Sequence, residues 1–495
     1  MAPPALTVRS AQGRWVIAAT VLGSGVATLD ATVVGIALPA ISRSLHAGVA
    51  TLQWIVTGYS ITLAAFLLLG GSLGDRLGRR RIFQVGVVWF ALASAACGLA
   101  PDRAVLIAAR LVQGIGGALL MPGSLAILQA SFAPNDRARA IGAWSALGAV
   151  AAAAGPLVGG YLLAAASWRW VFFINLPLSA LVVAIAARHV PETSDPAAGP
   201  TDAPGAALAV IALAASTFAL IEGPRRGWSG PAVVTGLVLA AAAVPGFIVA
   251  ERRRSHPMLP LSMFAERQFA GANAVTFAMY AGLGGALFFL PVALQIVAGY
   301  SAPDAGLALL PVTVLMLAFS ARSGRLAARI GPRLQMSVGP FLAGAGLVLL
   351  QRAADPGGYL MQVFPGVILF GAGLAVTVAP LTATAMGAAP PEQAGAASAV
   401  NNVVARAAGL IAVAVLPEVA GLTGARALQP AHLAGGFRTA VTVAGITCAA
   451  GGLLAAGLIR NPPPPAPAPS PRRWQCPVDG PGLHPEPAPA AIHRP

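Results

Sequence analysis

The chain contains no lysine and few charged residues of any kind. Charged residues make up 9% of its 495 residues, whereas a soluble protein carries about 25%. So little charge cannot cover a chain of this length with a water-facing surface, and lipid must therefore surround most of it. Without lysine there is also no phosphate-binding loop of the GxxxxGK(S/T) type, so ATP is not expected as an energy source.

Cysteine and histidine are also scarce. We expect no disulfide framework and no metal site, because Cys97 and Cys448 lie in apolar runs and Cys476 lies in a proline-rich tail. An integral-membrane enzyme would need acids, histidines or metal ligands gathered near one membrane face. The histidines before the tail are instead scattered over loops on both sides: His46, His189, His256 and His432. We therefore expect no catalytic residues and no cofactor, and an enzyme remains only a remote alternative.

Apolar runs of about 20 residues, each long enough to cross a bilayer, fill most of the chain. They lie at about 15–40, 51–73, 82–100, 104–128, 141–163, 170–188, 205–222, 231–250, 270–298, 305–327, 334–351, 359–387, 396–418 and 437–459. Lipid offers no partners to backbone groups, and no alternating barrel pattern is visible, so each run is expected to be helical. The predicted fold is an all-α integral membrane protein with about 14 transmembrane helices.

The arginines indicate the orientation. The formal net charge of +15 does not indicate nucleic-acid binding, because the arginines fall in short gaps between apolar runs rather than on one face. Alternate gaps, among them 76–81, 252–254 and 322–333, carry most of the arginines, which marks them as cytoplasmic. With an even number of spans, both termini are then expected in the cytoplasm. Since the first residues are too polar for a signal peptide, the first run is expected to stay as an anchor in the cell membrane.

An internal repeat divides the chain into two halves. GSLGDRLGRR at 71–80 aligns with GRLAARIGPR at 324–333, and ALPAI at 37–41 faces FLPVAL at 289–294 at nearly the same offset. Transporters built from repeats show such paired segments, although chance similarity between two arginine-rich loops is the alternative. The predicted organisation is an N-terminal segment (1–14), a six-helix bundle (15–188), a polar linker (189–204), two extra central helices (205–250), a loop (251–269), a second six-helix bundle (270–459) and a disordered tail (460–495).

The stretch GGSLGDRLGRRR at 70–81 resembles the loop signature between the second and third helices of the major facilitator superfamily. In that family the acid and arginines of this loop form ion pairs that hold the two halves together on the cytoplasmic side. The resemblance therefore implies a cytoplasmic latch made of Gly71, Asp75, Arg76, Gly78 and Arg79. A simple positive-inside anchor would explain the arginines, but it would explain neither the acid nor the glycine spacing.

ARLVQGIGGALLMP (109–122) resembles the fourth-helix motif of this superfamily. Three other stretches resemble its fourteen-helix drug/proton antiporters: LDATVVGIALPAI (29–41), LQWIVTGYSI (52–61) and WRWVFFINLP (168–177). GAVAAAAGPLVGG (148–160) resembles their antiporter motif, which places Gly148, Gly155, Pro156, Gly159 and Gly160 in it. Small residues at this spacing permit close helix contact. This sequence departs from the group at Gly35, where asparagine is usual, and at Ala407, where a polar residue is expected.

Few ionisable groups lie at membrane depth, and each is a functional candidate because such groups are costly there. Asp30 is roughly 22 Å along the first helix and Arg110 roughly 10 Å down the fourth, so both lie in the outer half and can pair if their helices face one another. We expect Asp30 and Arg110 to couple protons to substrate, with Glu418 a weaker candidate and a static ion pair as the alternative.

The resemblance implies a proton-coupled efflux transporter for drugs, antibiotics or other lipophilic small molecules. A dedicated exporter of one endogenous metabolite is the second hypothesis. Under either hypothesis, the expected partners of the protein are the substrate, protons and the lipid bilayer, with no nucleic acid. The protein is expected to act as a monomer. Polar and aromatic candidates for the substrate cavity, whose facing the sequence cannot fix, are Trp54, Tyr59, Gln113, Asn273, Tyr280 and Gln295.

Overall fold

The computed structural model describes residues 6–195, 202–254, 261–355, 357–389 and 394–461. Most of the predicted tail, with Cys476, lies outside these residues, as does His256. In the described parts, all but short connections are helical, as expected for a chain whose backbone groups must find partners without water.

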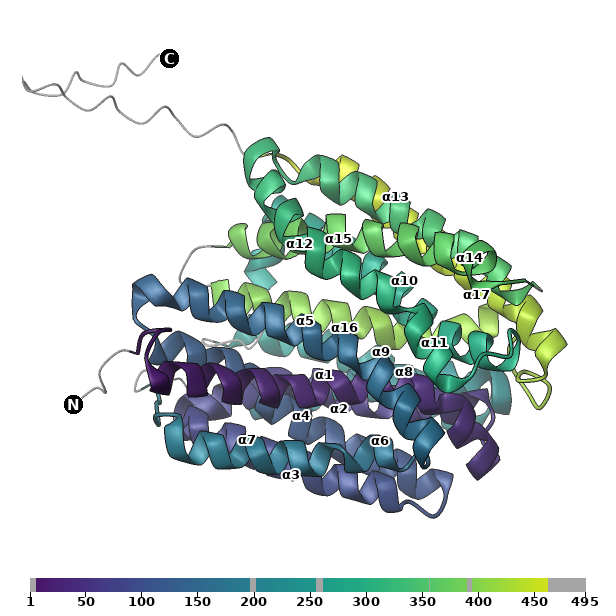
Figure 1. Ribbon diagram of the computed structural model, residues 1–495, viewed down its shortest axis with the longest axis horizontal. Helices are drawn as coiled ribbons and strands as arrows, with labels where there is room; N and C mark the ends of the chain where they lie inside the picture. Colours follow the sequence, from purple (N-terminus) through teal and green to yellow (C-terminus); the bar gives the residue numbers. More distant parts are fainter. Residues whose placement is uncertain (1–5, 196–201, 255–260, 356, 390–393, 462–495) are drawn as a thin grey trace, which may run out of the picture. The chain divides into compact units, whose positions relative to one another are not determined.

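The first seven helices, here called the N-half, lie together in Figure 1. They are α1 (Ala11–Leu45), α2 (Val49–Leu77), α3 (Arg79–Leu99), α4 (Arg103–Ser131), α5 (Pro134–Ala165), α6 (Trp170–Phe173) and α7 (Asn175–His189). The last helices, here called the C-half, are α10 (Arg267–Ile296), α11 (Ala302–Ala308), α12 (Leu310–Ile330), α13 (Arg333–Leu349), α14 (Tyr359–Gln362), α15 (Phe364–Gly387), α16 (Ala394–Val419) and α17 (Pro430–Leu458). Short 3-10 turns precede α10 (Leu261–Ala265) and follow α13 (Leu350–Ala354).

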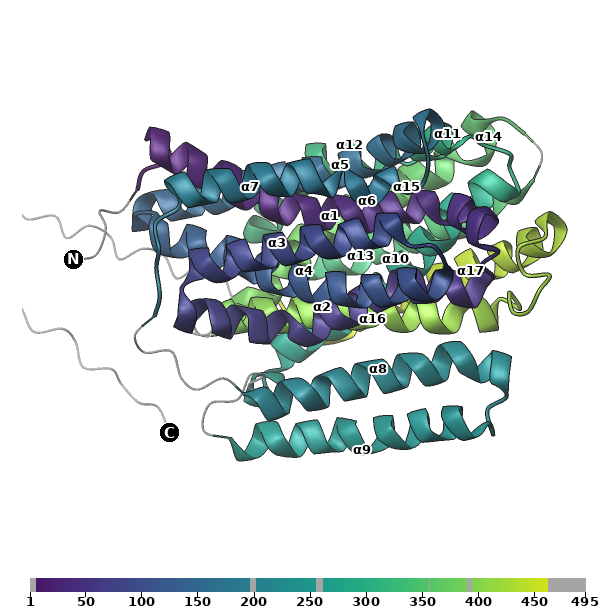
Figure 2. The same cartoon turned by 90° about the horizontal axis from the view of Figure 1, so that it is seen from below.

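Two further helices, α8 (Ala203–Arg226) and α9 (Pro231–Arg253), form a separate antiparallel pair, here called the insertion. Figure 2 shows this pair beside the rest of the bundle, and α8 packs against α2 of the N-half and α16 of the C-half. The insertion therefore lies across the line where the two halves meet.

Thirteen helical segments of the described chain are long and apolar enough to cross a membrane. They include two spans that are broken: α6 and α7 meet at Ile174, and α11 and α12 meet at Leu309. The predicted span at 141–163 is not among these thirteen segments, but it lies within α5, which has 32 residues. Many helices extend beyond the predicted apolar runs by several residues, because polar residues at a helix end can lie outside the lipid while they continue the helix.

The internal repeat is visible at the ends of two helices. The helix α2 ends at Leu77 and α12 at Ile330, and the glycine that follows each has a positive φ, 107° at Gly78 and 87° at Gly331. Residues with a Cβ atom rarely adopt this backbone conformation, so glycine lets the chain turn at once into α3 or α13. The alignment of 71–80 with 324–333 thus corresponds to the same turn in both halves.

We name the two ends of the bundle by residues in their loops. The Ala47 end carries the turn between α1 and α2, and the Asp75 end carries the turn between α2 and α3. Toward the Ala47 end, Val33 and Ile55 of the N-half share one apolar core with Phe289 of the C-half. Toward the Asp75 end, N-half residues such as Phe83 form a separate cluster. The two halves are therefore joined most extensively at the Ala47 end.

In this structure the predicted latch contacts the segment that follows α7. Arg79 Nε donates to Asp75 Oδ1 at 2.8 Å, and the peptide N–H of Asp195 donates to the Asp75 carbonyl at 2.8 Å. The Glu192 carboxylate accepts the peptide N–H groups of Arg80 and Arg81 at 3.0 and 3.2 Å. In this structure the latch turn therefore holds the segment after α7.

Glu192 provides a prediction about this turn. Glu192→Ala removes an acceptor from the exposed N–H groups that begin α3, which is expected to cost about 0.5–2 kcal/mol locally. Hydrogen exchange of the peptide covering residues 79–86 should accelerate. Glu266→Ala is the matched control, because Glu266 precedes α10 without capping it through its side chain. Equal exchange in the Glu192 variant and the native protein would contradict the assignment.

Candidate functional site

Asp30 lies at the centre of a buried polar network inside the N-half. Its side chain has no exposed surface, and that of Arg110 is 1% exposed. Arg110 Nη1 lies 2.5 Å from Asp30 Oδ2. Gln113 Nε2 and Asn175 Nδ2 each donate to Asp30 Oδ1 at 2.9 Å. The carboxylate thus has three hydrogen-bond donors from two other helices, α4 and α7.

Arg110 is also held by groups other than Asp30. Its Nε donates to the Ile55 carbonyl at 3.0 Å, and its Nη1 donates to Gln113 Oε1 at 2.7 Å. The guanidinium carbon lies 4.4 Å from the centroid of the Tyr59 ring, a cation–π distance. A buried charge is tolerated when it is paired and its donors are satisfied, and Arg110 meets both conditions.

Two partners of this network are neutral residues that we did not single out in the sequence. Asn175 opens α7 directly after the break at Ile174, and its Nδ2 lies 2.9 Å from both Asp30 Oδ1 and Ser94 Oγ. Ser94 donates to the Phe172 carbonyl at 2.9 Å, a carbonyl near the break between α6 and α7. The signal that points to Asn175 is its place in WRWVFFINLP, the stretch that resembles the antiporter group.

A central cavity of about 240 Å³ lies between the two halves. Helix α1 contributes Ala31, Gly35 and Leu38, and the other lining residues come from α2, α10 and α16. Gly35, where the antiporter group usually has asparagine, therefore lies on the cavity wall. Asp30 precedes Ala31 in the sequence, but it points into the N-half and is not among the lining residues.

The predicted cavity residues are distributed over several sites. Tyr280 lines the central cavity, whereas Tyr59 and Gln113 belong to the Asp30 network. Gln295 joins the halves by donating to the Ile36 carbonyl at 2.9 Å. Asn273 is buried within the C-half, where its Oδ1 accepts from Asn401 at 3.2 Å.

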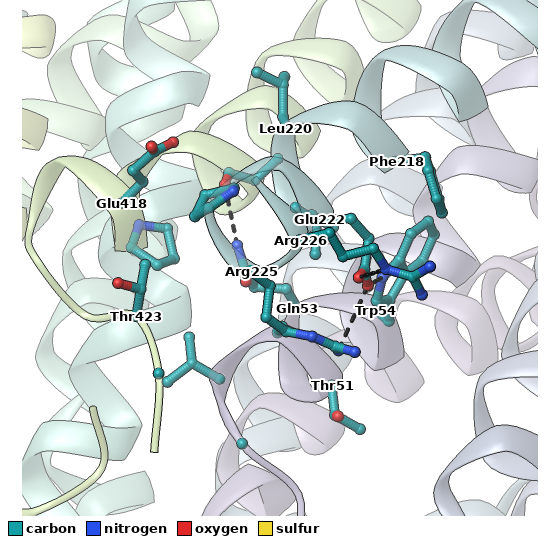
Figure 3. A pocket seen from close by; sticks show the side chains of 18 of the residues that line it. Thr51, Gln53, Trp54, Phe218, Leu220, Glu222, Arg225, Arg226, Glu418 and Thr423 are labelled. Atoms are coloured by element: carbon teal, nitrogen blue, oxygen red, sulfur yellow. Dashed lines mark hydrogen bonds and ion pairs between the residues drawn. The ribbon is translucent and has the colours of Figure 1, made fainter. Parts of the chain in front are cut away.

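Trp54 lines a different pocket of about 720 Å³ at the Ala47 end, between α2, the insertion and α16 (Figure 3). There Glu222 is buried and accepts from Trp54 Nε1 at 3.1 Å and from Arg226 Nε at 2.7 Å. Glu418, the weaker coupling candidate, lines this pocket and accepts from Trp228 Nε1 at 3.3 Å. Glu222 and Glu418 thus lie near the ends of their helices at the Ala47 end, away from Asp30.

Glycines of the antiporter motif pack α5 against α1 of the N-half and against the C-half. A Cβ on Gly155 would lie 1.9 Å from Thr32 Oγ1, and a Cβ on Gly159 would lie 2.9 Å from a methyl carbon of Val33, both on α1. A Cβ on Gly160 would lie 2.7 Å from Pro303 Cα in the C-half.

The remaining two motif positions, Pro156 and Gly148, differ in their surroundings. A Cβ on Gly306 of α11 would lie 2.4 Å from the Pro156 carbonyl oxygen, so α5 and α11 meet backbone to backbone. Gly148, by contrast, has open space around it. The end of the motif therefore forms a contact between the two halves near the Ala47 end.

Comparisons with known proteins agree with this architecture. The sequence pattern of the Major Facilitator Superfamily matches residues 20–413. The multidrug resistance protein Stp of Mycobacterium tuberculosis (strain CDC 1551 / Oshkosh) is 37% identical over 416 residues, which cover 84% of this chain and 77% of that protein. The methylenomycin A resistance protein of Streptomyces coelicolor is 38% identical over 81% of this chain and 85% of that protein.

Solved structures support the fold alone. An inward-facing bacterial homolog of the human lysosomal transporter Spinster superposes with a TM-score of 0.65 at 18% identity, covering 91% of this chain and 98% of that chain. The inward-open xylose transporter XylE from E. coli superposes with a TM-score of 0.62 at 15% identity, covering 90% of this chain and 96% of that chain.

Proposed function

The chain belongs to the major facilitator superfamily, a family of transporters rather than enzymes, and we propose that it exports lipophilic small molecules, antibiotics among them, in exchange for protons. Relatives named for multidrug and antibiotic resistance support the substrate class. In this proposal the Asp75 end faces the cytoplasm, as do both termini. The energy source is the proton gradient, with no cofactor.

The observation that carries the proton coupling is the Asp30 network beside the central cavity. A proton on the carboxylate removes its charge, which weakens the hydrogen bonds from Arg110, Gln113 and Asn175. These donors lie on α4 and α7, so a change in protonation alters how α1 packs against both helices. Since α1 also supplies Ala31 and Gly35 to the cavity wall, proton binding and substrate binding can affect each other.

Tyr59 offers a second connection between the two places. Its ring lies over Arg110, and its hydroxyl group is near enough to Asp30 and Arg406 for electrostatic interaction with both. Arg406 itself lines the central cavity. We therefore place the proton at Asp30 and the substrate in the cavity, with α1 and Tyr59 between them.

The test uses inverted membrane vesicles whose lumen has been acidified and contains a pH-sensitive dye. Lipophilic antibiotics added outside should release protons from vesicles with the native protein and not from vesicles without it. The Asp30→Asn variant should release no protons, because an asparagine side chain cannot bind and release a proton as a carboxylate does. Proton release that persists in this variant would move the coupling site elsewhere. A response to one compound only would favour the dedicated exporter.

A further inference from the structure

Two arginines, Arg110 and Arg406, lie deep in the membrane-spanning bundle, and they differ in the partners that surround their charge. Arg110 has a carboxylate partner, a carbonyl acceptor and an aromatic ring. Arg406, on α16, donates from Nη2 to the thioether sulfur of Met121 at 3.2 Å. Its buried Nε has no acceptor, and no carboxylate pairs with it among the residues that the structure describes.

A cation in this position is costly unless something compensates its charge. Thioether sulfur is a weak acceptor and carries no charge, so Met121 does not replace a carboxylate. Arginine keeps its proton under all physiological conditions, so the charge cannot be lost by deprotonation. The compensating group must therefore come from outside the described chain.

The place where that group can bind is the central cavity, which Arg406 lines. The other polar residues on its wall are Thr57, Ser60 and Tyr280, and none of them is ionised at neutral pH. Thr57 and Ser60 also direct their hydroxyl groups to carbonyls of their own helix, at 2.7 and 3.2 Å. Because Asp30 and Arg110 neutralise each other, the charge of the cavity is set by Arg406.

The rest of the wall is apolar, with Leu287 and Phe288 from α10 and Leu410 from α16. A ligand that fits has an apolar body and one acidic group. The cavity volume of about 240 Å³ is slightly below the roughly 300–1,000 Å³ of most ligand pockets. The apolar body of the ligand must therefore be small. A guanidinium binds a carboxylate through two parallel hydrogen bonds, which adds geometric preference to charge attraction.

We propose that Arg406 is the substrate-charge selector of the central cavity, and that the exported compounds are small lipophilic acids bound there as anions. This inference rests on the proposed function, since it names the substrate class of the same cavity. It also separates this chain from an exporter of lipophilic cations, for which an uncompensated arginine in the cavity would be repulsive.

The test measures binding of three probes that share a naphthalene ring and have similar size: 1-naphthoate, 1-naphthamide and 1-naphthylmethylammonium. Isothermal titration calorimetry with the purified full-length protein in lipid nanodiscs at pH 7 gives their dissociation constants. The native protein should bind naphthoate about ten-fold more tightly than naphthamide, and the ammonium probe most weakly. Arg406→Gln should reduce the naphthoate-to-naphthamide ratio to about one, and Arg406→Lys should keep part of it.

Two controls keep the result specific. Arg43→Gln removes one positive charge from the exposed end of α1 and should leave the ratio unchanged. Retained binding of naphthamide shows that a variant is folded. The proposal is overturned if the native protein does not prefer naphthoate at probe concentrations up to millimolar, or if the preference survives in Arg406→Gln. Vesicle export of neutral or cationic antibiotics without such a preference would leave the proposed function standing and refute this inference alone.

Discussion

Asp30→Asn is expected to destabilise the protein by about 3–5 kcal/mol, because it leaves the buried Arg110 charge without its counterion. Adding Arg110→Gln removes that charge, so the double variant should regain most of the lost stability. Its proton release in response to substrate should nevertheless stay absent, since no carboxylate remains at the centre of the network. Stability and coupling should thus separate in the double variant.

Thermal unfolding can be followed through the buried thiols of Cys97 and Cys448, which become reactive as the protein opens. Cys476→Ser removes the remaining cysteine first. The control is Asp355→Asn, which breaks the half-exposed ion pair with Arg438 and should cost at most about 1 kcal/mol.

The same experiment separates the two interpretations of the ion pair. If Asp30 and Arg110 only fix the packing of α1 against α4, the double variant should recover proton release together with stability. If they couple protons to substrate, it should recover stability alone. A single variant that is as stable as the native protein would contradict the burial argument itself.

The main features of the fold could be predicted from the sequence because membrane helices are long and uninterrupted by charge. The repeat could also be predicted, since the turn at Gly78 and at Gly331 requires glycine in both halves. The breaks at Ile174 and Leu309 could not, because both lie within continuous apolar runs. Hydropathy alone gives no signal for a short break whose carbonyls are satisfied by neighbouring helices.

The site was predictable in part, for a similar reason. Charge is so rare in this chain that Asp30 and Arg110 stand out, and helix geometry places them at similar depth. Asn175 and Ser94 are neutral, and polar residues of this kind occur in many membrane helices. Which way they face depends on the packing of α3 and α7, which no local pattern encodes. Likewise, only the assembled structure places Arg406 on a cavity wall.

Gly160→Val is expected to disrupt the contact between the halves at the Ala47 end. The new side chain would begin 2.7 Å from Pro303 Cα and 2.8 Å from the Ala302 carbonyl oxygen, and backbone atoms cannot move aside as a flexible side chain can. Overpacking of this kind costs about 1–3 kcal/mol in the arrangement that contains it. The population with the Ala47 end closed should therefore fall by roughly ten- to hundred-fold relative to an open one.

Gly148→Val is the matched control, because the same substitution in the same motif meets open space. Spin labels at R43C and L307C, exposed positions of α1 and α11, report the distance across the Ala47 end. Gly160→Val should shift this distance distribution to longer values and slow substrate export, whereas Gly148→Val should change neither. Unchanged distances with normal export in Gly160→Val would show that the contact between α5 and the Ala302–Pro303 backbone accommodates the valine without opening the Ala47 end. The motif would then contribute to helix packing within the N-half only, through Gly155 and Gly159 against α1.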